Sequence, residues 1–310
     1  MIALSIIIPV FNGAASIERL VNELAKIRVD GGLELVLVND CSPDDSWRII
    51  QRLVQEAPMA IIAVDLARNF GEHNAVMAGY AVCSGQYVIN IDDDFQNPPS
   101  EVVKLLDYAK AHPELDVIYT KYERKRHSYF RNLGSRFNDA VARLLLNKPK
   151  GLYLSSFRCV NRFLCNEILS YTGPYPYIDG IILEHTQHIG TLQVVHAPRA
   201  EGRSSYTLRK LIRLWLFMFV NFSVMPLRLS SIMGFVFSGS GFILALYVVF
   251  ESVVLGNPQG WASITAGILV FSGIQLLMLG LIGEYLGRLY LMQKGKPQYA
   301  VRTVLKAEVG

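Results

Sequence analysis

An acidic run in the first third of the chain carries the residues best suited to chemistry. The mostly apolar stretch Val88–Ile91 leads directly into Asp92, Asp93 and Asp94, and a Gln-Asn pair and two prolines follow. Three adjacent carboxylates repel one another, so we expect a positive charge to lie among them. A hard divalent cation takes oxygen ligands and bridges to substrate phosphates, so the run suits such an ion. A solvated acidic turn is the alternative interpretation.

Strand-like and helix-like segments alternate over the part of the chain that contains this run. Five short apolar runs predict strands, and their even lack of polarity suits a parallel sheet covered on both faces. They are Leu4–Val10, Leu33–Asn39, Ile61–Asp65, Tyr87–Asp92 and Val117–Thr120. Helices are predicted between them, for example at Ser16–Ile27 and Trp47–Gln55, and the segment Ser42–Asp45 has the residue types of a helix start. The alternation predicts a doubly wound α/β domain.

Two polar clusters fall at the ends of predicted strands. Asn39–Ser42 closes the second strand, and Asp92–Asp94 closes the fourth. In doubly wound sheets, ligands bind beyond the carboxyl ends of the strands, so we expect both clusters at one ligand-binding edge. No GxGxxG motif follows the first strand, which argues against a dinucleotide ligand.

The last third of the chain contains two long runs without a charged residue. Of the 310 residues, 51% are hydrophobic, and the excess lies at Leu229–Phe250 and Trp261–Gly283. Each run exceeds the roughly 20 residues that cross a bilayer core, so we predict two transmembrane helices. Two buried core helices are the alternative. The net charge of +4 is too small to indicate a nucleic-acid partner.

Basic residues flank the two apolar runs on both sides. This pattern predicts that both flanks, and the large N-terminal domain, lie in the cytoplasm. The flanking residues are Arg209, Lys210, Arg213 and Arg228 before the runs and Arg288, Lys294, Lys296, Arg302 and Lys306 after them. The predicted organisation is a domain at 1–205, an interfacial amphipathic segment at 206–228, two membrane helices at 229–288 and a cytoplasmic tail at 289–310.

Four short motifs follow one another along the chain: Ile8–Asn12, Val38–Ser42, Arg68–Gly71 and Asp92–Pro99. In order and spacing they resemble those of the family 2 inverting glycosyltransferases of GT-A fold. The last motif has the form D-x-D-x-Q-x-P-P, and with two C-terminal membrane helices it is similar to that of the polyprenyl-phosphate glycosyltransferases. The resemblance covers nearly the whole chain and extends to Gly280–Arg288 at the end of the second apolar run.

The resemblance implies a GT-A α/β catalytic domain that moves a sugar from a nucleotide donor to undecaprenyl or another polyprenyl phosphate. The anomeric carbon would be inverted, with UDP as the expected nucleotide and GDP as the alternative. Such enzymes act at the inner membrane and supply sugars for cell-envelope glycans such as lipopolysaccharide. Two other interpretations are a glycosyltransferase with another acceptor and a non-catalytic membrane protein that binds nucleotide-sugar or carrier lipid.

Carried over residue by residue, the resemblance implies a donor site at the strand ends. Asp92 and Asp94 would hold Mg²⁺ or Mn²⁺ on the diphosphate, and the ion would neutralise the leaving nucleotide. Gln96 would line the sugar-acceptor site, and Asp93 is expected to matter least. The other expected nucleotide-sugar contacts are Pro9, Phe11, Asn12, Asp40 and Arg68.

A second motif concerns the acceptor. Residues Arg199–Tyr206 resemble the R-x-x-G-x-S-K-Y loop of the same group, which suits recognition of a lipid phosphate. The expected phosphate contacts are Arg199, Arg203, Ser204, Ser205 and Arg209, with Arg203 supplying the charge because Ser205 stands where Lys is common. The next segment, Thr207–Phe222, has basic residues on one helix face and apolar residues elsewhere, which predicts an interfacial helix. A surface loop with incidental arginines and a buried helix are the alternatives.

The chain departs from the family pattern at two places. Gly13 stands where many relatives have Glu. Some relatives carry an Asp just before a Phe-Arg pair, but Gly151–Arg158 contains no acid and has Ser156 there. A phosphate acceptor is already ionised near neutral pH, so it needs no general base. Asp179 and Glu184 are the alternative acids, and a helix cap is the structural role expected of Asp179.

Gly283 and Gly287 form a small-xxx-small pair in the second apolar run. Such pairs favour close helix packing, either within one chain or between two chains. A homo-oligomer is therefore one expectation.

Overall fold

The computed structural model describes residues 2–122, 148–149, 151–173, 176–195, 225–255, 260–293, 295 and 297–307. The chain divides into two compact units. The first comprises Met1–Ser205 and Gly295–Gly310, and the second comprises Tyr206–Lys294. The acceptor loop predicted at Arg199–Tyr206 and the helix predicted at Thr207–Phe222 lie outside the described residues.

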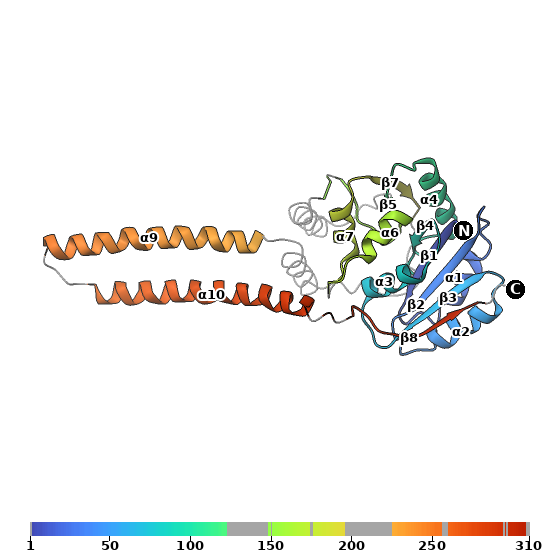
Figure 1. Cartoon of the computed structure of the whole chain (residues 1–310), viewed down its shortest axis with the longest axis horizontal. Coiled ribbons are helices and arrows are strands. Elements are labelled where there is room, and N and C mark those ends of the chain that lie inside the picture. The colour runs from blue at the N-terminus through green and yellow to red at the C-terminus, as the bar shows by residue number, and fades with distance from the viewer. Residues whose placement is uncertain are drawn as a thin grey trace. The chain divides into compact units, whose positions relative to one another are not determined.

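The first unit is built on one eight-stranded sheet (Figure 1). Its strands are β1 (Leu4–Val10), β2 (Leu33–Asn39), β3 (Ala60–Leu66), β4 (Tyr87–Asn90), β5 (Val117–Tyr122), β6 (Arg158–Asn161), β7 (Ile189–Val194) and β8 (Val301–Lys306). Its helices are α1 (Ile17–Leu24), α2 (Ser46–Glu56), α3 (Glu72–Val82), α4 (Pro99–Ala111), α6 (Arg162–Leu169) and α7 (Ile178–His185). All five predicted strands are confirmed, two of them with identical bounds.

The sheet is mixed and has the order β7-β5-β6-β4-β1-β2-β3-β8. The central strands β4, β1, β2 and β3 are parallel, as predicted. The prediction of a fully parallel sheet was wrong, because β6 runs antiparallel between β4 and β5, and β8 runs antiparallel along β3. This arrangement is a GT-A-like α/β fold. Both antiparallel strands come from later parts of the chain, so strand-helix alternation could not reveal them.

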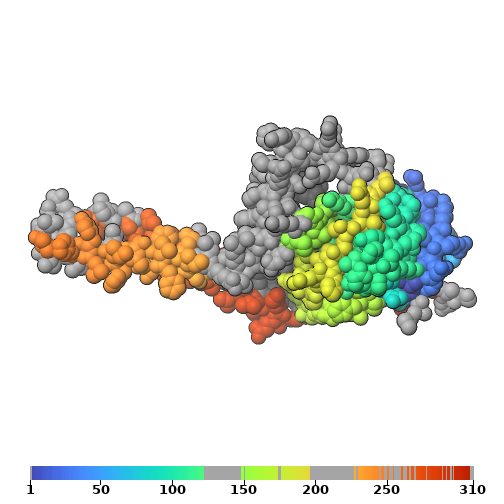
Figure 2. Space-filling model, turned by 90° about the horizontal axis from the view of Figure 1, so that it is seen from above, coloured from blue at the N-terminus to red at the C-terminus, as the bar shows by residue number. Residues whose placement is uncertain are grey.

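Side chains of the central strands alternate between two apolar cores, one on each face of the sheet. In β1, Ile6 and Ile8 pack with α1, α2 and α4, whereas Ile7 packs on the other face with α3, α6 and α7. On the surface, α4 lies beside β7 (Figure 2), where Lys104 Nζ donates to the carbonyl oxygen of Gln193 at 2.7 Å. Burial on both faces is the reason that these strands carry no polar face.

Helix α2 begins at Ser46, three residues after the proline of the predicted start. The cap residue is Asp45, which makes no side-chain capping hydrogen bond. Ser42 and Asp44 instead accept hydrogen bonds from backbone amides of the loop after β1. The predicted helix start was therefore wrong, because tertiary contacts take the side chains that the pattern assigned to capping.

The segment predicted as a tail at 289–310 contains the end of a helix and the strand β8. Gln298 Nε2 donates to the carbonyl oxygens of Tyr171 at 2.7 Å and Gly173 at 2.9 Å, and Ala67 N donates to the carbonyl oxygen of Ala300 at 2.9 Å. The segment after the apolar helices is thus an edge strand of the first unit.

The second unit contains two long antiparallel helices, α9 (Met225–Leu255) and α10 (Trp261–Gln293), which lie side by side (Figure 1). Phe237 and Phe271 meet edge to face with ring centroids 6.2 Å apart. Many described apolar side chains of both helices are exposed, a pattern that marks a membrane or protein interface. Within the described residues, Val270–Gly287 is long and apolar enough to cross a membrane, and Ser230–Ile243 is a shorter apolar stretch.

Candidate active site

Backbone strain gathers at the carboxyl ends of three neighbouring strands. In the part of the chain that the structure describes, three residues other than glycine have positive φ: Asn12 at 58°, Cys41 at 52° and Phe95 at 60°. They follow β1, β2 and β4, which are adjacent in the sheet. Left-handed backbone is unfavourable for residues with a Cβ and concentrates at functional loops. The strain therefore marks the same edge as the sequence motifs.

Three hydrogen bonds tie the loop after β1 to the start of α2. The amides of Asn12, Gly13 and Ala14 donate to Ser42 Oγ at 3.2 Å, Ser46 Oγ at 2.9 Å and Asp44 Oδ2 at 3.0 Å. These bonds hold Asn12 at its positive φ, while the preceding Phe11 is 49% exposed. Phe11 and Asn12, two of the expected nucleotide contacts, therefore lie on a loop that is held in place by residues 42–46.

Gly13 approaches the acidic run closely. A Cβ at this position would overlap the Asp93 carboxylate and would lie 2.7 Å from Val10 Cγ1. A side chain such as the Glu found in many relatives therefore has no room here without movement of Asp93. The absence of a side chain at Gly13 therefore lets Asp93 lie against the loop after β1.

Asp40 is buried and positions a neighbouring loop. Its Oδ1 accepts from the amide of Phe70 at 2.7 Å, and its Oδ2 accepts from the amide of Gly71 at 2.8 Å. The Arg68 guanidinium stacks 4.6 Å above the Phe70 ring. Asp40 therefore fixes the loop that carries Arg68. Phe70 links these two expected nucleotide contacts, because its amide donates to Asp40 and its ring stacks on Arg68.

The acidic run follows β4 and is half-buried. Asp92 Oδ2 accepts from Ser156 Oγ at 2.7 Å, and Asp94 Oδ1 accepts from the amide of Gln96 at 3.1 Å. The Arg19 guanidinium lies 4.7 Å above the Phe95 ring. Asp94 and Gln96 are therefore joined in one turn, directly after Asp92.

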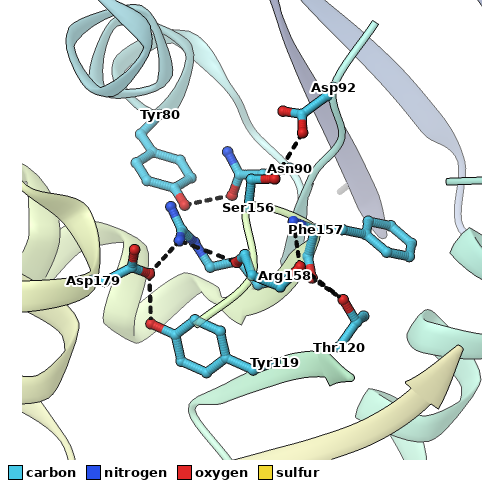
Figure 3. Close-up of polar contacts among 10 residues, drawn as sticks. Tyr80, Asn90, Asp92, Tyr119, Thr120, Ser156, Phe157, Arg158 and Asp179 are labelled. Carbon is cyan, nitrogen blue, oxygen red and sulfur yellow. Dashed lines mark hydrogen bonds and ion pairs between the residues drawn. The ribbon is translucent and has the colours of Figure 1, made fainter. Parts of the chain in front are cut away.

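A buried arginine lies beside the acidic run, and the sequence analysis missed it. Arg158 at the start of β6 pairs with Asp179, Nη1 to Oδ1 at 2.5 Å, and Tyr119 donates to the same oxygen at 2.9 Å (Figure 3). Nearby, Tyr80 donates to Asn90 Oδ1 at 2.6 Å. Burial works against the charge, but Asp179, Tyr80 and Tyr119 together raise the Arg158 pKa. The antiparallel pairing of β6 with β4 places Arg158 opposite Asn90, two residues before the acidic run, and the ion pair that it makes is with Asp179.

Asp179 lies in the first turn of α7 and is 8% exposed. Its Oδ1 is shared between Arg158 and Tyr119. The N-cap residue of α7 is Tyr177, so the expectation that Asp179 caps this helix was wrong. The other alternative acid, Glu184, is exposed near the end of the same helix. In this geometry the Asp179 carboxylate holds Arg158.

Glu72 is a second residue that the sequence analysis missed. It is the first residue of α3, directly after the Arg68–Gly71 motif, which was the available signal. Although the residue is exposed overall, burial of its carboxyl raises the pKa to about 7, and the charges of Asp92, Asp179 and Asp94 add to the shift while Arg158 opposes it. The start of a helix normally stabilises an ionised acid and lowers its pKa. At Glu72, burial and repulsion by neighbouring carboxylates outweigh this effect.

The negative charge of the acidic run favours the binding of a divalent metal ion. Asp92 and Asp94 contribute carboxylate oxygens at one turn, and no described group of three His, Cys, Asp or Glu residues could hold a metal. Mg²⁺ commonly binds one or two carboxylates and completes its shell with substrate phosphates and water. The donor set therefore fits a hard divalent ion that binds together with a diphosphate. The acceptor contacts expected at Arg199, Arg203, Ser204, Ser205 and Arg209 lie outside the described residues.

Comparison with known proteins places this geometry in a family. The model of the family described as glycosyl transferase family 2 matches residues 5–169. An undecaprenyl-phosphate 4-deoxy-4-formamido-L-arabinose transferase of Pseudomonas fluorescens is 33% identical over 313 residues, which cover 98% of this chain and 91% of the relative. The transferase of the same name from Proteus mirabilis is 30% identical over 306 residues, covering 97% and 93%.

Solved structures show the same fold. Glucosyl-3-phosphoglycerate synthase from Mycobacterium tuberculosis, in complex with Mn²⁺, UDP and phosphoglyceric acid, aligns with a TM-score of 0.53 at 19% identity. The alignment covers 70% of this chain and 76% of that chain. A second structure of that synthase, with UDP, aligns with a TM-score of 0.51 at 20% identity, covering 70% and 78%.

Proposed function

Because the chain belongs to glycosyl transferase family 2 and is a glycosyltransferase of the polyprenyl-phosphate type, we propose that it transfers a sugar from a UDP-sugar to undecaprenyl phosphate, with inversion. The similarity of almost the full chain to undecaprenyl-phosphate transferases carries this proposal. The names of these relatives make 4-deoxy-4-formamido-L-arabinose the first sugar to test, and we propose its UDP conjugate as the donor. The product would be a lipid-linked sugar for cell-envelope glycans.

The strand-end loops would bind the donor. Asp40 orders the loop that carries Arg68, and the loop after β1 presents Phe11 and Asn12 beside it. Asp92 and Asp94 would hold Mg²⁺ or Mn²⁺. When bound, the ion supplies positive charge that stabilises the leaving nucleoside diphosphate.

The acceptor chemistry needs no general base. A polyprenyl phosphate is ionised near neutral pH, so its oxygen can attack the anomeric carbon without losing a proton to the protein. Ser156 stands where some relatives have an acid, and Asp179 is engaged by Arg158 and Tyr119. We therefore assign Asp179 a positioning role and leave the attacking oxygen to the phosphate itself, with Gln96 lining the sugar site.

The position of β8 in the sheet is an argument for a membrane hairpin. The chain leaves the first unit before residue 206 and rejoins the same sheet as β8, so the intervening part crosses a membrane an even number of times. Crossing by α10, which contains the apolar stretch Val270–Gly287, therefore requires a second crossing, for which α9 is the candidate. Basic residues on both flanks favour the cytoplasmic side for the catalytic unit. Among the described residues, none lies within 4 Å of a Cβ built at Gly283 or Gly287, so this small-residue pair is available for packing against a neighbouring helix.

Turnover in detergent tests the proposal. The purified full chain is incubated with undecaprenyl phosphate, Mg²⁺ or Mn²⁺, and a panel of UDP- and GDP-sugars, while nucleotide release and glycolipid are followed together. We expect glycolipid from one UDP-sugar and none from the Asp94→Asn variant. Donor binding without glycolipid from any sugar would instead support a non-catalytic carrier or another acceptor.

A further inference from the structure

Ser156 contacts the acidic run from a distant part of the chain. Its Oγ donates to Asp92 Oδ2 at 2.7 Å, across 64 positions of sequence (Figure 3). Ser156 belongs to the segment that leads into β6, whereas Asp92 follows β4. The antiparallel pairing of these two strands brings the residues together, with Asn90 opposite Arg158 in register.

Both neighbours of this serine are anchored. On one side, Ser155 Oγ accepts from Thr120 Oγ1 at 3.1 Å and from the amide of Phe157 at 3.2 Å. On the other side, the carbonyl oxygen of Phe157 accepts from Thr120 Oγ1 at 2.6 Å, and the next residue, Arg158, is buried in its ion pair with Asp179. Because the backbone is held on both sides and serine has one side-chain torsion, the hydroxyl has little freedom to leave Asp92.

The chemistry of serine suits this position. A hydroxyl that donates to a carboxylate makes a charge-assisted hydrogen bond, which is stronger than a neutral one and fixes the carboxylate plane. An acid here would instead place a negative charge within hydrogen-bond distance of Asp92, which Asp93 and Asp94 already follow in the chain. Serine provides orientation without further repulsion.

We propose that Ser156 is a positioning residue of the donor site, and that its hydroxyl orients Asp92 toward the divalent ion and the diphosphate. This inference rests on the proposed function, because it takes Asp92 as part of the donor site. The hydroxyl touches neither the sugar nor the acceptor in this assignment. It acts through the orientation of Asp92 and therefore on the donor and metal alone.

Direct binding separates this role from a general loss of stability. Mn²⁺ binding in the presence of UDP is measured by electron paramagnetic resonance for the parent chain, Ser156→Ala and Ser156→Thr. The matched control is Ser5→Ala, which removes another serine–carboxylate hydrogen bond, of 2.6 Å to Glu34, at the opposite edge of the same sheet. Steady-state KM values for UDP-sugar and for undecaprenyl phosphate complete the set.

We expect Ser156→Ala to weaken Mn²⁺–UDP binding about tenfold, the lower end of the range for residues that orient metal ligands. The KM for UDP-sugar rises by a similar factor, the KM for undecaprenyl phosphate stays unchanged, and Ser156→Thr restores binding. Unchanged Mn²⁺–UDP binding in Ser156→Ala would overturn the proposal, as would an equal loss in Ser5→Ala. If the parent chain makes no glycolipid but Ser156→Ala still loses Mn²⁺–UDP binding, the proposed function fails and the positioning role stands.

Discussion

The carboxylates at the two ends of the central strands have opposite surroundings. At the amino-terminal edge, Glu34 is 3% exposed and accepts from Ser5 Oγ at 2.6 Å, Ser84 N at 2.5 Å and Ser84 Oγ at 2.8 Å. At the carboxyl-terminal edge, burial and then the charges of Asp92, Asp179 and Asp94 raise the pKa of Glu72. At the amino-terminal edge, one carboxylate accepts three hydrogen bonds. At the carboxyl-terminal edge, several carboxylates lie close enough to repel one another.

The difference separates a structural edge from a reactive one. A buried charge that is fully hydrogen-bonded stabilises its surroundings and has no remaining affinity for a ligand. A cluster of like charges is unfavourable alone, but it binds a cation strongly when one is supplied with a substrate. The four predictions below test this contrast, from the largest expected effect to the smallest.

Arg158→Met removes the buried positive charge beside the acidic edge. Loss of one partner leaves Asp179 buried and unpaired, so we expect the free energy of unfolding to fall by about 3 to 5 kcal/mol. Denaturant unfolding followed by tryptophan fluorescence measures the change. The double variant Arg158→Met/Asp179→Leu is the control and should recover most of the loss, whereas equal loss in both variants would show that the ion pair is not the cause.

Asp94→Asn removes one negative charge at the reactive edge while the shape of the side chain is kept. We expect turnover to fall about a thousandfold, because a divalent ion supplies several kcal/mol of transition-state stabilisation. Thermal stability should stay the same or rise, since repulsion decreases. A variant that keeps more than a tenth of the parent rate would contradict the assigned metal site.

Glu34→Gln makes the corresponding change at the structural edge. Three hydrogen bonds lose their ionic acceptor, so we expect a loss of about 1 to 3 kcal/mol in the free energy of unfolding. Turnover per folded molecule should equal that of the parent chain. If instead the rate falls while stability holds, the two edges are coupled and the contrast between them is wrong.

Glu72 contributes a pH dependence of stability whose sign follows from its raised pKa. Its pKa rises from 4.5 to about 7 on folding, so the folded state favours the protonated acid. The resulting stabilisation is complete below pH 4.5 and is lost as the pH rises through about 7. Melting temperatures measured in EDTA between these limits should fall more steeply for the parent chain than for Glu72→Gln. Parallel curves would mean that Glu72 does not titrate in this range.

Local pattern predicted the central sheet and the location of the acidic edge well. The strands Leu4–Val10 and Leu33–Asn39 have the predicted bounds, because burial on both faces leaves continuous apolar runs between polar turns. The start of α2 was predicted wrongly, because Ser42 and Asp44 bind the neighbouring loop. Capping residues and loop anchors have the same composition, and only the fold distinguishes them.

The sequence by itself determined the first five strands and their order along the chain, the carboxylates at the strand ends and the family to which the chain belongs. These features are local, since each depends on residues adjacent in the chain. The tertiary structure alone decided that Arg158 lies beside the acids, that Ser156 binds Asp92 and that β8 completes the sheet. Each depends on antiparallel pairing between segments far apart in sequence, and the register of such pairing is set by packing of the whole sheet.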